Sequence, residues 1–381
     1  MKVTLSLTHN CNLACRYCYA GSKYHRDMSS ETAFKILDFA MTQTNNGQPI
    51  QINFFGGEPF LCFDLMRELA DYALQISSKS GQVVSLGVTT NGTLLNNSAL
   101  KFLLDYDVDL CISLDGPAVI HDSQRVFKNG KGSFEKVVYN LNKALSELTS
   151  VQVNAVYGPS TLSALPDVID FFIDLNLPVI HLNPDIITRW NADACHALAS
   201  SFEQVADRYI LSYQRGRELA VNVLDGKAIL FMKGGYEPDD LCGMGETEFG
   251  FAPSGNIYAC ERFIGNDDDP RFRLGNIHTG VDIKRRCRVT SIRGNNNPEC
   301  VRCNLRPYCM NWCGCTNFHM TGLSNQAGAA LCAGERAIIA AAKRVFTTLS
   351  DNDLYIDHLL HYLQNKCCAT INKRKEDLNN G

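Results

Sequence analysis

The chain has 381 residues, with 36 Lys and Arg against 40 Asp and Glu, and a formal net charge of -4. This balance argues against a protein that binds nucleic acid through bulk positive charge. A composition of 45% hydrophobic and 20% charged residues excludes a disordered chain. At roughly 150 residues per domain, the length predicts two or three domains. The unusual feature is the count of 17 cysteines.

The context of these cysteines favours reduced thiols over a disulfide scaffold. Disulfide scaffolds are usually short and secreted, whereas this chain is long and opens MKVTLSLTHN, without the charged and apolar regions of a signal peptide. The most apolar stretch, near 329–342, is interrupted by Glu335 and Arg336 and does not qualify as a membrane span. We therefore expect a cytoplasmic protein with no membrane association.

Short apolar runs alternate with helical periodicity over the first 200 residues, which is typical of repeated βα units and a parallel sheet. The runs predict six strands, at 3–7, 51–55, 83–88, 109–114, 151–156 and 179–183. Apolar residues at i, i+3, i+4 and i+7 predict helices between and after them, at 33–41, 66–73, 134–141, 165–172 and 198–209. Ser29 or Ser30 is the expected N-cap of the first helix. Six strands in six units indicate an α/β fold, a partial (β/α)6 barrel.

The composition changes near residue 240, and nine cysteines fall within 240–335. This segment has little periodicity, as expected where metal orders the chain more than an apolar core does. We expect a partial barrel at 1–200, a helical linker at 201–238, a small Cys-rich domain at 239–345 and a helical tail at 346–381. Within the tail, 354–363 is amphipathic, and the polar run 372–381 is expected to be frayed.

The first chemical motif, Cys11, Cys15 and Cys18, follows the first strand with C-x3-C-x2-C spacing. Three thiolates cannot close a four-ligand zinc site, but they can hold three irons of a [4Fe-4S] cluster and leave the fourth iron open. The alternatives are an incomplete zinc site or incidental thiols. With Tyr17 before the third cysteine, the motif resembles the signature of the radical S-adenosylmethionine (SAM) superfamily.

The second strand ends in Gly56-Gly57-Glu58-Pro59, which resembles the GGEP motif of that superfamily. The resemblance implies that its backbone and carboxylate receive the amino group of SAM. Glycine permits a close backbone approach, and a carboxylate suits an ammonium group. The same four residues also form ordinary turns.

Polar residues follow the next two strands, Thr90-Asn91-Gly92 after one and Ser113-Leu114-Asp115-Gly116 after the other, with Arg125 shortly beyond. Active sites of barrels lie at these strand ends. The resemblance implies that Asn91 belongs to the SAM site, that Ser113 and Asp115 lie at the SAM ribose or its surroundings, and that Arg125 binds the SAM carboxylate. The alternative for each is a polar turn residue or a helix cap.

A second set of cysteines has multi-part spacing, with Cys242 and Cys260 on either side of Gly255, and then a C-x2-C-x5-C-x3-C run and one more cysteine. This pattern resembles the SPASM domain, which holds two auxiliary [4Fe-4S] clusters in peptide-modifying radical SAM enzymes. The resemblance assigns one set of cysteines to the first auxiliary cluster, Cys242, Cys260 and Cys313, and another to the second, Cys300, Cys303, Cys309 and Cys332. A zinc ribbon is the alternative.

The first auxiliary cluster is one ligand short in this assignment. Its fourth position is open, or is taken by Cys315, by Glu248 or by the substrate. The other cysteines without a ligand spacing are expected to be inert thiols: Cys62, Cys111, Cys195, Cys287, Cys367 and Cys368, the last two exposed. Three [4Fe-4S] clusters predict about twelve irons per chain.

The resemblance also implies the chemistry, in which a reduced cluster cleaves SAM as co-substrate and the resulting 5'-deoxyadenosyl radical removes a hydrogen atom from a substrate carbon. The auxiliary clusters then accept the electron that the substrate radical must lose. Glu261, next to Cys260, is a candidate catalytic base. Its alternative is an ion pair with Arg262 or Arg273.

We expect a peptide maturase that installs a carbon-carbon or thioether crosslink in a ribosomally made precursor peptide. Its expected partners are a precursor peptide or protein, a reductase, flavodoxin or ferredoxin as electron donor, and a separate peptide-recognition protein, because Cys11 leaves no room for such a domain. One alternative is a sulfatase-maturing oxidase that makes formylglycine, although Phe55 stands where those oxidases often carry glutamine. Another is an iron-sulfur electron-transfer protein without catalysis.

Overall fold

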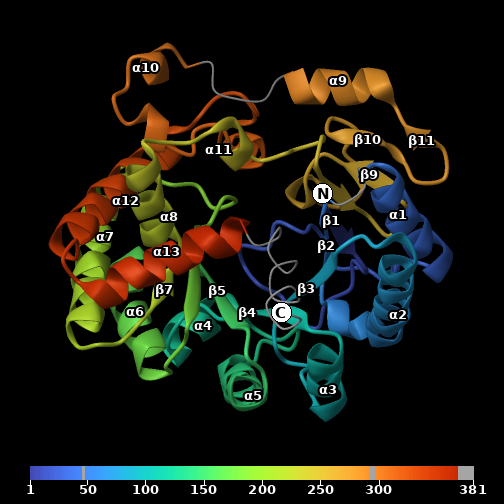
Figure 1. Cartoon of the computed structure of the whole chain (residues 1–381), viewed down its shortest axis with the longest axis horizontal. Coiled ribbons are helices and arrows are strands. Elements are labelled where there is room, and N and C mark those ends of the chain that lie inside the picture. Colours follow the sequence, from blue (N-terminus) through green and yellow to red (C-terminus); the bar gives the residue numbers. More distant parts are fainter. Residues whose placement is uncertain (45–47, 292–296, 368–381) are drawn as a thin grey trace, which may run out of the picture.

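A computed structural model describes residues 1–44, 48–291 and 297–367, without the side chains of 362 and 364–367. Within these ranges the strands form one sheet in the order β11-β10-β9-β8-β1-β2-β3-β4-β5-β6-β7. Helices surround the strands on the outside (Figure 1). None of the helices in the described ranges combines the length and apolarity needed to cross a bilayer.

Six neighbouring strands of the sheet run parallel, as predicted. They are β1 (Lys2–Ser6), β2 (Ile50–Phe55), β3 (Val84–Thr90), β4 (Val108–Ser113), β5 (Val151–Tyr157) and β6 (Val179–Pro184). A two-residue strand, β7 (Ala220–Val221), continues the parallel pairing beyond β6. The α/β class and the six strands expected from the apolar runs are therefore confirmed.

The connecting helices are α1 (Ser30–Thr42), α2 (Phe63–Ser80), α3 (Asn97–Asp105), α4 (Ala118–Gln124), α5 (Phe134–Glu147) and α6 (Leu165–Asp174). The side chain of Ser29 accepts a hydrogen bond from the Thr32 backbone N–H at 3.2 Å, so Ser29 is the N-cap of α1. Short 3-10 turns also occur: η1 (Pro59–Cys62), η2 (Leu162–Ala164), η3 (Pro238–Asp240), η4 (Glu261–Phe263) and η5 (Arg306–Tyr308).

The Cys-rich segment extends the same sheet. Its strands are β8 (Glu248–Phe251), β9 (Asn256–Tyr258), β10 (Arg273–Asn276) and β11 (Gly280–Val281). β8 pairs in parallel with β1, and the remaining strands pair antiparallel. The helices of this segment before residue 329 are α9 (Ile283–Ser291), α10 (Pro298–Val301) and α11 (Gly314–Thr321). The sheet thus runs without a break across residue 239, while the proposed domain limits themselves stay a prediction.

Four further helices cover one side of the barrel: α7 (Ala192–Gln214), α8 (Asn222–Lys233), α12 (Ala329–Thr348) and α13 (Asp353–Cys367). α12 lies along both α7 and α8 (Figure 1). The predicted helix at 354–363 falls inside α13. The predictions for Cys368 and for a frayed run at 372–381 lie outside the described residues, and so does the side chain of Cys367.

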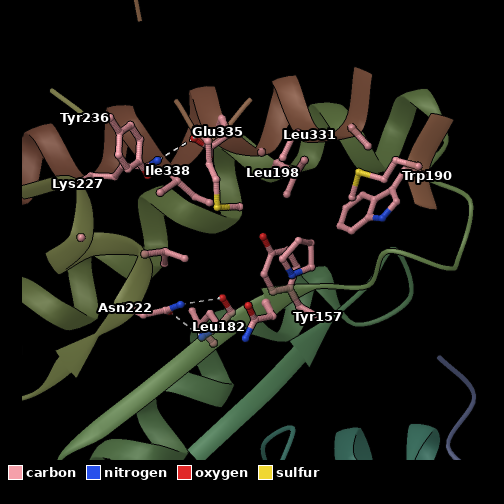
Figure 2. A pocket seen from close by; sticks show the side chains of 18 residues that line it. Tyr157, Leu182, Trp190, Leu198, Asn222, Lys227, Tyr236, Leu331, Glu335 and Ile338 are labelled. Atoms are coloured by element: carbon pink, nitrogen blue, oxygen red, sulfur yellow. Dashed lines mark hydrogen bonds and ion pairs between the residues drawn. The ribbon is translucent and has the colours of Figure 1, made fainter. Parts of the chain in front are cut away.

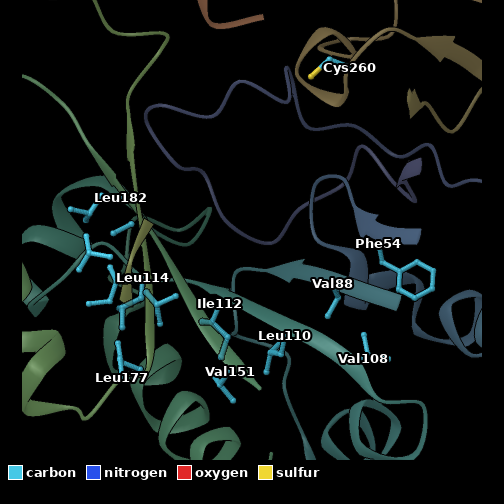
Figure 3. Close-up of a cluster of buried hydrophobic side chains, with 14 of the residues drawn as sticks. Phe54, Val88, Val108, Leu110, Ile112, Leu114, Val151, Leu177, Leu182 and Cys260 are labelled. Atoms are coloured by element: carbon cyan, nitrogen blue, oxygen red, sulfur yellow. The ribbon is translucent and has the colours of Figure 1, made fainter. Parts of the chain in front are cut away.

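Buried side chains from successive strands form the core beneath the sheet (Figure 3). Phe54, Leu110, Ile112 and Leu182 are each at most 1% exposed. Parallel strands covered on both faces read as nearly continuous apolar runs, which is why the sequence pattern located them. The packed core fixes the strands, and their carboxyl ends are left to carry polar residues.

Candidate active site

The loop between β1 and α1 carries Cys11, Cys15 and Cys18, and all three line one cavity at the carboxyl ends of the strands. Cys11 is buried, and Cys15 and Cys18 are partly exposed. The structure therefore brings the three predicted cluster ligands to one place.

Two glycines at the end of β2 allow this loop to pack closely. The Gly57 N–H donates to the Thr8 carbonyl at 2.8 Å, and the Glu58 N–H donates to the Asn10 carbonyl at 2.9 Å. A Cβ atom on Gly57 would lie 2.0 Å from the Asn10 carbonyl oxygen, and Gly56 has a φ of +131°. Glycine is therefore required by the approach of the cysteine loop itself.

Glu58 is fully buried and joins β2 to the end of β3. Its carboxylate accepts hydrogen bonds from the Asn91 N–H at 2.8 Å, the Thr90 hydroxyl at 2.7 Å and the Phe60 N–H at 3.2 Å. Burial raises the pKa of Glu58 to about 7, and these donors oppose the shift. Gly57 lines the cavity, while the Glu58 carboxylate lies behind the residues that do. Its direct contact with SAM stays a prediction.

Asn91 connects this network to the cysteine loop. Its side-chain amide donates to Asn12 Oδ1 at 2.8 Å and to Cys11 Sγ at 3.7 Å. Asn91 also lines the cavity, together with Ser113 at the end of β4. The hydrogen bonds from Asn91 to Glu58 and to Cys11 therefore hold a predicted cluster ligand in place relative to the ends of β2 and β3.

Asp115 anchors the opposite wall of the cavity. One carboxylate oxygen accepts from Arg125 Nε at 3.1 Å and from the Tyr17 hydroxyl, and the other accepts from the Val156 N–H at 3.0 Å. The Arg125 guanidinium lies over the Tyr17 ring, 5.1 Å from its centroid. Arg125 and Tyr17 line the cavity. The binding of the SAM carboxylate by Arg125 stays a prediction.

The three thiols fit an iron-sulfur cluster by their surroundings as well as their spacing. Cys11 Sγ accepts from the Leu13 N–H at 3.4 Å, and Cys18 Sγ accepts from Lys23 Nζ at 3.1 Å. The Leu13 N–H lowers the pKa of Cys11. Burial raises the pKa of Cys11 to about 11, so cluster binding has to displace its proton. When bound, a cluster with an open iron supplies one electron to SAM, and the protein residues orient the reactants and exclude water.

The predicted ligands of the first auxiliary cluster lie together. Cys260, Cys313 and Cys315 are buried, and the Sγ atoms of Cys313 and Cys315 are 3.5 Å apart. Cys242 is partly exposed, and its Sγ lies 3.7 Å from a carboxylate oxygen of Glu248. Both alternatives for a fourth protein ligand are thus close to this group.

The predicted ligands of the second auxiliary cluster are split between two surroundings. Cys300, Cys303 and Cys332 line one cavity, and Cys195 of α7 lines the same cavity. Cys309 lies instead beside the buried ion pair of Lys227 and Glu335. Among the described residues, no three His, Cys, Asp or Glu side chains converge closely enough to hold a single metal ion. The choice between two auxiliary clusters and a zinc ribbon stays a prediction.

Glu261 lies between the auxiliary cysteines and two cations. Its carboxylate is 3.3 Å from Cys260 Sγ. Burial is the largest single influence and raises the pKa of Glu261, but the charges of Lys2 and Arg262 and two hydrogen bonds together outweigh it, and the net shift of this pKa is downward. Arg262 lines the cavity that contains the three cysteines Cys11, Cys15 and Cys18, whereas Glu261 lies near Cys260 and Lys2. Its assignment as a catalytic base stays a prediction.

A second cavity lies between the ends of β5 and β6 and the helices α7, α8 and α12 (Figure 2). Tyr157, Trp190 and Leu331 give it a mainly apolar lining, and the Lys227–Glu335 pair lies at one side. Asn183 and Pro184 line both cavities. The two cavities are therefore neighbours at the ends of the barrel strands.

Sequence reasoning missed three residues of the site, Lys23, Tyr19 and Arg262. All three line the first cavity, and the Arg262 guanidinium is 5.9 Å from the Tyr19 ring centroid. Burial is the largest single influence and lowers the pKa of Arg262, but the negative charges of the ionised Cys315, Tyr19, Cys313 and Glu261 side chains together outweigh it, and the net shift of this pKa is upward. Lys23 could have been suspected as a cation five residues after Cys18, but no spacing connects Arg262 with Tyr19.

Comparison with known proteins agrees with this geometry. The family profile described as "Radical SAM superfamily" matches residues 5–188. A cysteine-type anaerobic sulfatase-maturating enzyme of Clostridium novyi is 23% identical over 326 residues, covering 80% of this chain and 85% of that protein. The mycofactocin maturase MftC of Mycolicibacterium smegmatis is 29% identical over 291 residues, covering 72% of this chain and 67% of that protein.

The fold is shared with a solved structure, native anSMEcpe with bound AdoMet. The TM-score is 0.78 at 18% identity, over 92% of this chain and 99% of that one. The cysteine loop, the strand-end cavity and the family match agree over the same part of the chain. Residues 5–188 are a radical SAM domain, and the protein is a radical SAM enzyme.

Proposed function

We propose that this enzyme is a peptide maturase, which uses a 5'-deoxyadenosyl radical to oxidise a residue of a ribosomally made precursor peptide and form a crosslink. The observation that carries the proposal is the pair of neighbouring cavities at the strand ends. One cavity is lined by the three cysteines and by Arg125. The other lies between the ends of β5 and β6 and three helices, and its lining is mainly apolar. The first suits SAM, and the second suits a substrate side chain next to it.

The polar groups of the second cavity narrow the kind of side chain. Lys227 Nζ is bound by Glu335 at 2.7 Å and by the Tyr308 carbonyl at 2.7 Å, and Glu335 also accepts from the Met310 N–H at 2.6 Å. These charges are already satisfied by the protein. An apolar or aromatic substrate side chain therefore fits better than a charged one, because burying an unpaired charge is costly.

The further cysteines support an oxidative outcome. A substrate radical becomes a closed-shell product only after losing another electron, and iron-sulfur sites near the cavity can accept it. Arg262 lies between the first cavity and the thiol of Cys315. The proposal includes two auxiliary iron-sulfur sites, an electron donor such as a flavodoxin, a ferredoxin or a reductase, and the cytoplasm as its location.

A formylglycine-generating oxidase is the second candidate. It is favoured by the likeness to the Clostridium novyi sulfatase-maturating enzyme over 80% of this chain. Phe55, which lines the first cavity, is the residue that argues for a different substrate. The two candidates differ in product, because formylglycine carries an aldehyde and a crosslink does not.

Anaerobic incubation of the reconstituted protein with dithionite and SAM tests the radical chemistry. We expect 5'-deoxyadenosine from the wild type and from Cys287→Ser, an exposed thiol outside all three groups. We expect none from the triple variant Cys11→Ala/Cys15→Ala/Cys18→Ala. If the wild type makes no 5'-deoxyadenosine, or the triple variant still makes it, the proposal is wrong.

Coexpression with peptides encoded beside the gene tests the substrate. A crosslink predicts a mass loss of two hydrogens without reaction with a hydrazide probe. Reaction with the probe would instead identify an aldehyde and support the formylglycine alternative. An unmodified peptide counts against that peptide as the substrate.

A further inference from the structure

Two glycines inside helices line the second cavity, the one between the ends of β5 and β6 and the helices α7, α8 and α12. Gly226 lies within α8, and Gly334 lies within α12. These two helices pack against each other (Figure 1). In a helix interior, glycine is the least favourable residue after proline. Two such positions at one cavity therefore require a structural reason.

The usual reasons for glycine do not apply to these two residues. Glycine serves where the backbone has a positive φ or where another element approaches too closely for a side chain. Neither Gly226 nor Gly334 has a positive φ. Among the described residues, apart from the adjoining backbone, no atom lies within 4 Å of a Cβ added to either glycine. Gly334 is nevertheless buried, so the open space in front of it is the cavity.

The size and lining of this cavity fit one aromatic ring. Its volume is about 160 Å³, and apolar cavities of about 150 Å³ hold benzene. Tyr157, Trp190 and Tyr236 line it together with the thioethers of Met310 and Met320. The rings of Tyr157 and Trp190 lie edge to face, with centroids 6.1 Å apart, and Figure 2 shows Tyr157 pointing toward the helices. Aromatic edges and thioethers are favourable neighbours for a further ring.

The polar groups of the lining favour a ring without a polar atom. The charged side chains that line the cavity, Lys227 and Glu335, bind each other at 2.7 Å. The amide of Asn183 donates to Asn154 Oδ1 at 2.6 Å. A phenol or an indole N–H would therefore lose hydrogen bonds to water on entering. Asn183 and Pro184 also line the cavity of the three cysteines, so a peptide residue held here lies next to that cavity.

We propose that Gly226 and Gly334 determine substrate specificity, because they keep open a pocket that takes one phenylalanine side chain of the precursor peptide. The ring in this pocket places a neighbouring part of the peptide at the cavity of the three cysteines. The identity of the ligand as a peptide rests on the proposed function, whereas the pocket itself requires no turnover. A larger residue at either glycine fills the pocket and excludes the ring.

Calorimetric titration of the reconstituted full chain with side-chain analogues tests the pocket. Toluene, p-cresol and 3-methylindole correspond to the side chains of phenylalanine, tyrosine and tryptophan. We expect toluene to bind at one site per chain, and the other two to bind more weakly, because each brings a polar group without a partner and 3-methylindole is also larger. Absence of toluene binding, or tighter binding of either other analogue, would overturn the proposal.

Filling the pocket from α12 tests the role of the glycine. Gly334→Leu should weaken toluene binding by about tenfold or more, because its side chain occupies the apolar space of the ring. Gly334→Ala should have a smaller effect in the same direction. Thr347→Leu, at an exposed position of the same helix, is the matched control and should bind toluene as the wild type does. Unchanged binding in Gly334→Leu would contradict the assignment.

Urea denaturation separates a specificity role from a packing role. Alanine is the better helix former, and its Cβ meets open space at this position. Gly334→Ala should therefore unfold at the same urea concentration as the wild type or at a higher one. A lower midpoint would show that Gly334 is needed for packing and would contradict the proposal.

A peptide that the wild type modifies tests the link to the substrate. Gly334→Leu should raise the KM for this peptide by about tenfold or more, and Thr347→Leu should leave it unchanged. An unchanged KM in Gly334→Leu would exclude the pocket from substrate binding. Toluene binding without modification of any tested peptide would support the pocket and count against the proposed function. A modified peptide without toluene binding would count against the pocket alone.

Discussion

At the scale of single residues, Glu58 couples the chemistry of the site to pH. Three hydrogen-bond donors meet its buried carboxylate, and no cation among the described residues pairs with it. Burial is the largest influence and raises its pKa to about 7. Near neutral pH the residue therefore changes charge, although the sequence suggests an ordinary acidic side chain.

Replacement of Glu58 by glutamine should change the pH dependence of stability. The pKa of Glu58 in the folded protein is about 7, above the ordinary value of 4.5. Between these values the folded protein holds more protons than the unfolded chain, so this group contributes less stability as pH rises through that window. We expect Glu58→Gln to gain in free energy of unfolding relative to wild type as pH rises from about 5 to about 7. Chemical denaturation of the metal-free, reduced full chain measures this difference.

The control for this experiment is Glu68→Gln, an exposed carboxylate on α2. Its free energy of unfolding should follow the wild-type pH dependence with a constant offset. Parallel curves for wild type and Glu58→Gln would show that the buried carboxylate does not titrate in this range.

At the scale of secondary structure elements, one buried ion pair connects α8, α12 and the loop that carries Cys309. Lys227 of α8 binds the Tyr308 carbonyl, and Glu335 of α12 binds the Met310 N–H, so the pair holds the backbone on both sides of Cys309. Both side chains are 7% exposed. The pair thus fixes a predicted cluster ligand relative to two barrel-covering helices.

Replacing one partner of this ion pair should lower the free energy of unfolding much more than replacing both partners with apolar residues. Lys227→Met leaves a buried carboxylate without its cation, and we expect a loss of about 3–5 kcal/mol in the free energy of unfolding. The double variant Lys227→Met/Glu335→Leu should recover much of that loss, because apolar residues can replace a buried pair. Urea denaturation measures both.

Lys233→Met on the same helix is the matched control. Lys233 pairs with Glu237 and Asp240 near the surface, and such pairs contribute about 0–1 kcal/mol. A loss in Lys227→Met no larger than in this control would contradict the role of the buried pair.

The strands and helices that could be predicted from the sequence are those with a continuous apolar run or a clear apolar stripe. The strands β1 to β6 are apolar runs covered on both faces, and Ala33, Ile36, Leu37 and Ala40 give α1 a clear stripe. The helices α3, α4, α8 and α12 were not predicted, and among them α4 has seven residues and buries only His121. The short strands β8 to β11 have two to four residues each and depend on pairing with one another and with β1. The hydrophobic periodicity of these short segments does not predict such pairing.

The site was predictable to the extent that it is contiguous in sequence. The cysteine loop and the strand-end motifs could be located by spacing, and the structure places them around one cavity. Arg262 could not be found this way, because it reaches the cavity only through the pairing of β8 with β1. The 3.5 Å contact between Cys313 and Cys315 likewise needs coordinates.

At the scale of the whole molecule, two kinds of stabilisation divide the chain. Residues 1–200 have a continuous apolar core, whereas 297–328 contains only the short helices α10, η5 and α11. Segments ordered by metal lose structure when the metal is removed. We expect hydrogen exchange in 297–328 to increase strongly in the metal-free full chain, while β1 to β6 stay protected.

Hydrogen-exchange mass spectrometry of the reconstituted and metal-free forms measures this contrast. The six core strands serve as the internal reference within the same molecule. Equal protection of 297–328 in the two forms would show that side-chain packing, and not metal, holds this segment.

The position of β1 has a consequence for the synthesis of the protein. β1 is bonded to β2 on one side and to β8 on the other, and Lys2 is in register with Glu248. At about 5–20 residues per second, a ribosome needs roughly 12–50 seconds between these two positions. During this interval the edge of the first strand that later pairs with β8 has no partner in the chain. This unpaired edge makes the nascent chain prone to edge-to-edge aggregation until β8 has been synthesised.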